Sequence, residues 1–298
     1  MKGKWVTIGF CFALLWASAS AATKIALLDA QPFVIAVSRF FIAGGLMLFF
    51  AHGIKKYRLP QKREWKQVML YGLMNISIYL GLYVMAMQKI SAGLGTLAVG
   101  MNPVIISMMA AAIFKKPVGL KDIISLLICL LGVFIAAYPL LKTSYASLDG
   151  IIIILVSMLA YSAAAIYYSY VEWNGLKIVT INGWQTIFGG LFLLPILFFT
   201  YKEGLNHYTH NFWVGTLWLA IPVSIGAVQC WLYLSRQNAS NASYWLFLCP
   251  VFGFLLSAAL LKEPLSWYTA VGVMLVLIGL YSRNSNKNYK VEVKNRKI

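Results

Sequence analysis

The sequence is poor in charged residues, and acidic residues are the scarcest of them. Charged residues make up 11% of the 298 positions, with eight Asp or Glu against 25 Lys or Arg. A soluble domain of this length carries roughly twice that charged share. Hydrophobic residues make up 61% of the chain. This balance excludes an ordinary soluble domain and makes membrane spans the unit to count.

Side chains that commonly carry catalysis or bind metals are also few. The three histidines lie outside the long apolar runs, and the four cysteines lie inside them without a CxxC pair. No Ser-His-Asp set, HExxH motif or phosphate-binding loop is visible. We therefore expect no enzymatic activity, no cofactor and no metal site. An integral-membrane enzyme or sensor is the alternative of another class, and it would need a catalytic constellation that these residues do not provide.

Long apolar runs are what the sequence has in abundance. A helix rises about 1.5 Å per residue, so about 20 residues cross a hydrocarbon core of about 30 Å. Ten runs approach or exceed this length: 5–28, 33–51, 66–87, 94–114, 120–138, 149–170, 179–200, 212–234, 240–261 and 266–283. The first run, with the small residues of 17–21, also fits a cleaved secretory signal. We expect a retained helix instead, because nothing downstream is typical of a secreted domain.

Positive charge gathers in alternate loops. If the N-terminus lies inside, 19 of the 25 Lys and Arg residues fall in inside segments and four fall in outside loops. The remaining two, Lys24 and Arg39, lie within apolar runs. Because Lys and Arg concentrate on the cytoplasmic side, this split predicts cytoplasmic N- and C-termini. We expect a multi-pass protein of the cell's inner (plasma) membrane, with residues 284–298 as a basic cytoplasmic tail near anionic lipid. We therefore interpret the net charge of +17 as a feature of segments that lie near anionic lipid, and not as a sign of nucleic-acid binding.

The chain contains an internal repeat. A shift of 147 positions superimposes four residues of the two halves, and a shift of 145 superimposes a glycine pair. The matched positions are Pro103 with Pro250, Lys115 with Lys262, Pro117 with Pro264, Gly132 with Gly279, and Gly44–Gly45 with Gly189–Gly190. Each unit holds five spans, and an odd number turns the second unit over in the membrane. The sequence therefore predicts an all-α integral membrane protein of ten transmembrane helices, arranged as two inverted five-helix repeats over 5–138 and 149–283.

Three segments resemble a known family. LLWASASAATKIAL (14–27), SRFFIAGGL (38–46) and LLKEPLSWYTAVGVMLVLIGL (260–280) are similar to the EamA domains of the drug/metabolite transporter superfamily. The resemblance covers about residues 5–283, so the two units would be a first and a second EamA-like repeat. It implies a substrate path through a central cavity between the halves, often for the export of amino acids, other metabolites or toxic compounds. It also implies a gating role for the loop of Glu263 and Pro264, whose first-half counterpart has Lys116 in place of the acid.

Aromatic and amide side chains inside the spans are the candidates for lining that cavity. An amide that faces lipid is costly, so a mid-span Asn or Gln is expected to face a cavity or another helix. Many of the candidates share a helix face by i, i+4 or i, i+7 spacing. The alternative is packing between helices, or aromatic anchoring at the membrane interface. The candidate substrate-binding residues are Trp16, Ser20, Asn75, Tyr79, Tyr83, Asn102, Tyr161, Tyr168, Gln229, Tyr233 and Trp245.

Two cations lie inside apolar runs. Lys24 is near the outer end of the first run, and Arg39 is about two turns into the second. They form either a positive outer vestibule that attracts carboxylates or structural anchors that snorkel to the interface.

Together these features favour a secondary transporter that exports small organic metabolites, such as amino acids, by alternating access through a central cavity. No acidic residue lies in the middle of a span. A buried carboxylate that trades a proton for a cationic drug is therefore not expected. A multidrug exporter of apolar or cationic compounds is the alternative. The expected partners are a small-molecule substrate and membrane lipid, while the coupling ion and the oligomeric state stay open.

Overall fold

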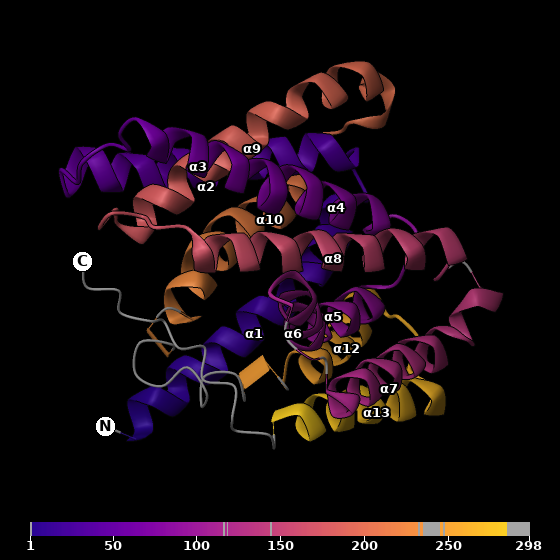
Figure 1. Ribbon diagram of the computed structural model, residues 1–298. Helices are drawn as coiled ribbons and strands as arrows, with labels where there is room; N and C mark the ends of the chain where they lie inside the picture. Colours follow the sequence, from indigo (N-terminus) through magenta and orange to yellow (C-terminus); the bar gives the residue numbers. More distant parts are fainter. Residues whose placement is uncertain are drawn as a thin grey trace.

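The computed structural model describes residues 2–115, 117, 119–143, 145–231, 233–234, 245–246 and 248–284. Over these residues the chain is a bundle of helices without a β-strand, and one antiparallel bridge joins Ile90 to Ala146. Figure 1 shows the long helices packed side by side, with the N-terminus at the lower left. Residues 285–298, almost the whole of the expected basic tail, lie outside the described residues.

The first five spans come from residues 2–142. The first is α1 (Lys2–Ala26), and the second is α2 (Pro32–Leu48) continued by the π-helical η1 (Phe49–Ile54). The third joins α3 (Arg63–Gly72), the π-helical η2 (Leu73–Leu80) and α4 (Gly81–Met87). The fourth joins α5 (Ala92–Gly100) to α6 (Asn102–Ile113), and the fifth is α7 (Leu120–Ala137) with the short turn η3 (Leu140–Lys142).

The second half repeats this order from residue 148. Its first two spans are α8 (Leu148–Tyr170) and α9 (Ile178–Thr200), followed by the short turn η4 (Glu203–Leu205). The third is the eighth span of the chain (His210–Trp231), which joins α10 (His210–Trp218) to the π-helical η5 (Leu219–Ala227) and a last helical turn. The last two are α12 (Leu248–Leu261) and α13 (Trp267–Asn284). The first residues of the expected run 240–261 lie outside the part of the chain that the structure describes.

These helices have the length and surface of membrane spans. Seven segments are long and apolar enough to cross a membrane, and the bent pair α5–α6 makes an eighth. Two shorter apolar helices, Leu248–Leu261 and Trp267–Tyr281, bring the total to the ten expected. Large side chains such as Leu127, Ile152 and Phe198 are exposed on the outside of the bundle. Soluble proteins rarely expose apolar surface on this scale, so the multi-pass, all-α membrane fold is confirmed.

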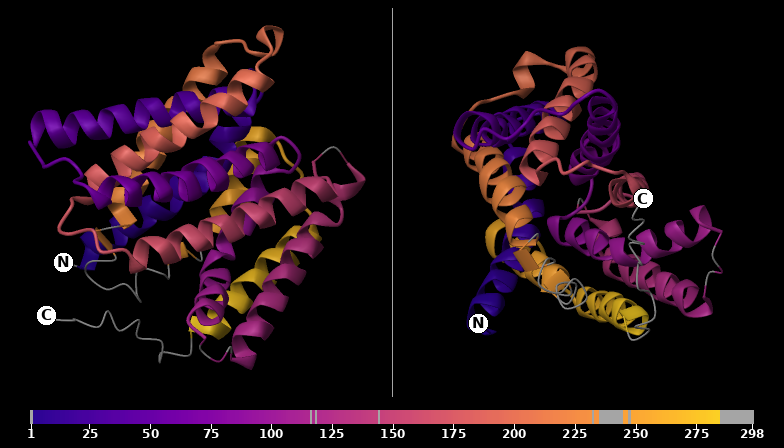
Figure 2. Two further views of the ribbon diagram at one scale, coloured as in Figure 1. Left: turned by 45° about the horizontal axis from the view of Figure 1, so that its top comes forward. Right: turned by 60° about the vertical axis from the view of Figure 1, so that its left-hand side comes forward.

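The packing of the helices follows the repeat. In the first half, α1 packs against α12 and η5 of the second half. Its counterpart α8 packs in the same way against α6 and η2 of the first half. The pairs α7 with α13, and α2 with α9, join each span to its own counterpart. Figure 2 shows α7 and α13 running side by side at one edge of the bundle. These contacts are therefore retained when the two halves are exchanged, as expected for an inverted repeat.

Irregular segments of the helices are also repeated. Shifted by 147 positions, the π-helical η2 covers residues 220–227, which is nearly all of η5. In the fourth span α5 and α6 meet at 40°. Pro103 causes this bend, because it lacks a backbone N–H and fits only the first turn of a new helix. These irregular turns break the regular period of the helix faces, which matters for the side chains that reach the interior.

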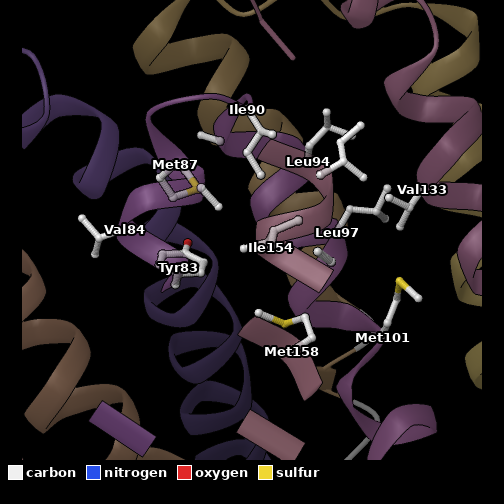
Figure 3. Close-up of a cluster of buried hydrophobic side chains, with 14 of the residues drawn as sticks. Tyr83, Val84, Met87, Ile90, Leu94, Leu97, Met101, Val133, Ile154 and Met158 are labelled. Carbon is white, nitrogen blue, oxygen red and sulfur yellow. The ribbon is translucent and has the colours of Figure 1, made fainter. Parts of the chain in front are cut away.

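The core of the bundle joins elements of both halves. Met87 of α4, Leu94 and Leu97 of α5, and Ile154 and Met158 of α8 are almost completely buried together. Figure 3 shows these side chains meeting between the ribbons of the three helices. The first helix of the second repeat is therefore packed into the first repeat.

The two ends of the bundle carry different loops. We call the end with the N-terminus and the loops 55–62 and 171–177 the basic face. The end with the loops 27–31, 88–91, 201–209 and 262–266 is the opposite face. In Figure 1 the basic face is on the left.

Candidate functional site

A cavity of about 580 Å³ lies between the two halves. Its lining comes from α1, α2, the third span, α5 and α6 of the first half, and from α8, α9 and the eighth span of the second. Its volume suits a small organic molecule. Eight of the predicted residues line it: Trp16, Ser20, Arg39, Asn75, Tyr79, Tyr83, Tyr161 and Tyr168.

Tyrosine rings form much of the wall. The ring centroids of Tyr79 and Tyr161 are 4.9 Å apart, so a contact between the third and sixth spans crosses the boundary of the repeats. The ring centroids of Tyr71 and Tyr168 are 5.1 Å apart, and Tyr71 also lines the cavity, although it is not among the residues predicted from the sequence. Offset rings of this kind give an apolar surface that still carries hydroxyl groups.

A short chain of hydroxyls closes the cavity near α5. Ser20 Oγ and the Tyr83 hydroxyl are 2.7 Å apart, and Thr96 Oγ1 donates to Ser20 Oγ at 2.7 Å. All three side chains are buried. The chain ties α1 to α4 and α5 and satisfies polar groups that would otherwise be costly in the membrane.

Amide side chains line another part of the wall. Asn75 Nδ2 donates to Gln185 Oε1 at 3.2 Å, and Gln185 Nε2 donates to Asn182 Oδ1 at 2.9 Å. Asn75 is among the residues predicted from the sequence, whereas Asn182 and Gln185 on α9 are not. Their i, i+3 spacing inside the apolar run 179–200 was the signal that could have found them.

Arg39 is the cationic side chain of the described lining. It is 5% exposed, and its Nε and Nη2 donate to Ser224 Oγ at 3.1 and 3.0 Å. Ser224 lies in η5 and itself donates to the carbonyl of Leu219. No Asp or Glu belongs to the described lining. The structure therefore places Arg39 inside the cavity and not in an outer vestibule.

Four predicted residues lie elsewhere. Asn102 is buried at the start of α6, beyond the bend, where its Oδ1 has no hydrogen-bond partner among the residues that the structure describes. Gln229 is exposed on the outside of the eighth span, whose lining residues are Val223, Ser224, Val228 and Trp231. The π-helical turn of η5 explains this shift, because it displaces the faces that a regular helical period would predict.

The other two residues contact the start of the first helix. The ammonium of Lys4 lies 5.6 Å from the centre of the Tyr233 ring. The rings of Trp5 and Trp245 are 5.4 Å apart. Tyr233 and Trp245 therefore pack near the basic face, outside the cavity lining.

Glu263 caps a helix of the other repeat. Its carboxylate oxygens accept hydrogen bonds from the backbone N–H groups of Ala92 at 2.7 Å and Gly93 at 3.2 Å, at the start of α5. The side chain is 7% exposed, while the neighbouring Pro264 is exposed. A carboxylate at a helix N-terminus is favourable because it satisfies unpaired N–H groups and meets the positive end of the helix dipole.

Lys24 does not belong to the cavity. It lies in the last turn of α1, outside the described lining. Lys116, the first-half counterpart of Glu263, lies outside the described residues.

The opposite face is closed by contacts between the halves. Asn206 Oδ1 accepts from the Gln31 backbone N–H at 2.8 Å, and Asn206 Nδ2 donates to Gln31 Oε1 at 2.9 Å. Lys89 forms an ion pair with Asp149. At the other end the lining reaches Ser169 and Ile178, the neighbours of the loop 171–177. The cavity thus extends to the basic face and is shut at the opposite face.

Two inverted five-helix repeats around a polar and aromatic cavity define the class of a multi-pass membrane transporter. The model of the EamA-like transporter family matches residues 3–138 and 148–283. The chain therefore belongs to the EamA-like transporter family, within the drug/metabolite transporter superfamily.

Relatives in bacteria and plants cover nearly the whole chain. A protein named as an uncharacterized transporter in Synechocystis sp. is 25% identical over 94% of this chain and 89% of its own length. A WAT1-related protein of Arabidopsis thaliana is 25% identical over 90% of this chain and 66% of its own, and Protein PecM of Dickeya dadantii is 25% identical over 89% and 87%. A solved crystal structure at 17% identity superimposes with a TM-score of 0.66 over 95% of this chain and 99% of its own, which shows the shared fold.

Proposed function

We propose that the protein is a secondary transporter that exports small organic metabolites, such as amino acids, by alternating access through the central cavity. One observation carries this proposal. The cavity lies between two inverted repeats, extends to the basic face and is shut at the opposite face by hydrogen bonds that join the halves. Breaking those bonds while new ones form at the basic face would expose the same cavity to the other side.

The lining supports an amphipathic substrate. The rings of Tyr79 and Tyr161 offer an apolar surface, and the amides of Asn75 and Gln185 offer donors and acceptors beside it. Such groups can replace the water that a polar metabolite loses when it enters the membrane. The aromatic wall also favours a second candidate, an exporter of apolar toxic compounds. A cationic drug is the less favourable cargo, because no carboxylate belongs to the described lining.

The direction of transport follows from the orientation that we propose for the membrane. If the protein lies in the inner (plasma) membrane with both termini cytoplasmic, the basic face is the cytoplasmic face. The cavity then opens to the cytoplasm, where an exported metabolite would enter.

Transport can be tested with purified protein in liposomes loaded with a defined mixture of amino acids and other metabolites. Mass spectrometry of the external solution identifies the compounds that leave. Ala165 lines the cavity on α8, whereas Leu159 faces outward on the same helix. We expect efflux in the wild type and in Leu159→Trp, and loss of efflux in Ala165→Trp, whose ring would fill the cavity. Equal efflux from the two tryptophan variants would refute the cavity as the path, and efflux of no compound would refute the proposed substrate class.

A further inference from the structure

Arg39 carries a buried positive charge that no acidic side chain of the described cavity lining neutralises. Its side chain is 5% exposed, its hydrogen-bond partner is the neutral hydroxyl of Ser224, and no carboxylate belongs to the described cavity lining. A charge that leaves water loses several kcal/mol of hydration unless an opposite charge or several hydrogen bonds replace the water. We propose that Arg39 is the anion-binding residue of the cavity, and that the substrate is an amphipathic molecule whose carboxylate binds this guanidinium. The proposal rests on the proposed function, because it assigns the substrate class of the same cavity.

The guanidinium has donors left for a ligand. It carries five N–H groups in a planar fork. The described hydrogen bonds use one N–H on Nε and one on Nη2, both to Ser224 Oγ. The remaining N–H groups on Nη1 and Nη2 lie next to each other in the fork, which is the arrangement that binds both oxygens of a carboxylate. Ser224 thus holds the guanidinium on one edge and leaves the other edge available.

The buried acidic residues of the described chain are already paired with other groups. Glu64 binds the guanidinium of Arg58 at 2.7 Å, and Glu263 accepts the backbone N–H groups at the start of α5. Neither belongs to the cavity lining. Among the described residues no acidic side chain is left to balance Arg39, so we infer that a molecule entering the cavity supplies the counter-charge.

The surroundings of Arg39 narrow the class of anion. It is the one cationic side chain in the described lining, so a single negative charge balances it, whereas a phosphate dianion would need a second cation. The rings of Tyr79 and Tyr161 line the same cavity and provide an apolar surface for the body of the molecule. A monocarboxylate with an apolar or aromatic body fits both conditions.

The charge of the cavity can be measured with a cysteine reporter at Ala165, which lines the cavity wall on α8. Cys11 is exposed and Cys230 is half-buried, so both are replaced by Ser in the background. The reagents are two methanethiosulfonates of similar size, the anionic sulfonatoethyl and the cationic trimethylammonium-ethyl forms. We expect the ratio of the anionic to the cationic reaction rate to fall about ten-fold in Arg39→Gln and to be retained in Arg39→Lys, because the potential follows the charge.

Two further variants separate the charge of Arg39 from its packing. Lys24→Gln removes another cation of the spans that lies outside the described lining, and we expect no change in the ratio. Ser224→Ala removes the hydrogen bonds of Arg39 but keeps its charge, so the ratio should again be unchanged. If the ratio of the anionic to the cationic reaction rate were the same in the wild type and in a well-folded Arg39→Gln, the anion site would be refuted. The proposed transport function would not be affected by that result. If the cysteine reacted with neither reagent in any variant, the cavity itself would be closed to water, and the proposed function would be contradicted.

The class of ligand is tested by protection of the same cysteine. The probes are phenylacetate, 3-phenylpropanoate, their two neutral amides and phenyl phosphate. We expect both carboxylates to slow labelling with the neutral reagent methyl methanethiosulfonate at least five-fold, and the amides to have no effect. The protection should disappear in Arg39→Gln and persist in part in Arg39→Lys. Equal protection by carboxylates and amides, or protection by phenyl phosphate alone, would overturn the assignment of a monocarboxylate.

Discussion

Glu263 and Ala92 join the two repeats directly: a carboxylate oxygen of Glu263 accepts a hydrogen bond from the Ala92 backbone N–H at 2.7 Å. The second oxygen accepts from Gly93, and both groups are buried. The bond fixes the loop between the last two spans of the second repeat to the start of α5 in the first. A motion that separates this loop from the start of α5 breaks this contact.

Replacing Glu263 should therefore favour opening at the opposite face. Glu263→Gln removes one acceptor oxygen and the negative charge that meets the helix dipole. We expect this to destabilise the closed state of the opposite face by about 1–2 kcal/mol. A cost of that size changes the population of a closed state roughly ten-fold. We expect labelling of Thr96→Cys from the opposite face to increase by about that factor, measured with an impermeant thiol reagent. Lys262→Gln changes a charge in the same loop without touching the cap, and an equal increase in that control would contradict the role of Glu263.

Lys115 and Lys262 have the same strained backbone in the two repeats. Their φ angles are +51° and +54°, and both side chains are exposed after the fourth and ninth spans. This left-handed conformation is costly for residues with a Cβ and not for glycine. We expect Lys115→Gly and Lys262→Gly each to stabilise the protein by about 0.5–1 kcal/mol, seen as similar rises in the thermal unfolding midpoint in detergent. Lys115→Gln and Lys262→Gln remove the charge but keep the Cβ. A rise of the same size in these two variants would assign the effect to charge instead.

Gly272 allows α7 and α13 to approach closely. A Cβ at this position would lie 2.5 Å from the backbone oxygen of Gly132 and 2.7 Å from the Cβ of Ala136. Because backbone atoms cannot move aside cheaply, we expect Gly272→Ala to destabilise the protein by about 1–3 kcal/mol. Gly45 on α2 has nothing within 4 Å of the same position, so Gly45→Ala should be neutral or stabilising. Thermal unfolding of the two variants under identical detergent conditions provides the comparison, and equal midpoints would contradict the close contact.

The sequence contained most of the information about the fold. Apolar run lengths locate spans because helix rise and bilayer thickness are fixed, and the matched pairs such as Gly132 and Gly279 indicated the repeat. The structure adds the repeated π-helical segments η2 and η5, for which no periodic signal exists in the chain.

The cavity was harder to predict, residue by residue. Tyr79 and Tyr161 were selected because aromatic side chains recur at helical spacing, and both line the cavity. Gln229 was selected by the same rule, but it lies on the outside of a span whose π-helical turn displaces the face. Gln185 is not among the predicted residues, although its i, i+3 spacing from Asn182 is a signal of a polar face on this helix. Tertiary packing decides which face of a span points inward. The local spacing of polar residues along the sequence does not carry that information.

Comparison of two glutamines tests this placement. Gln185 is 4% exposed, bonds Asn75 and Asn182, and lines the cavity, whereas Gln229 is exposed on the outside of the eighth span. A substrate that crosses the membrane needs hydrogen bonds in place of the water that it leaves. Loss of one such bond costs about 1 kcal/mol, so we expect Gln185→Ala to weaken apparent substrate affinity roughly five-fold. Gln229→Ala should leave it unchanged.

The measurement is the concentration dependence of efflux from liposomes that contain equal amounts of each variant, for any compound that the wild type transports. Gln185→Glu gives a second test, because it keeps one acceptor and adds a negative charge to a lining that has no carboxylate among its described residues. That charge would repel a carboxylate substrate, so Gln185→Glu should reduce transport more than Gln185→Ala does. If Gln229→Ala reduced affinity as much as Gln185→Ala did, the polar path would run along the outside of the eighth span, and the cavity between the repeats would not be the site of binding.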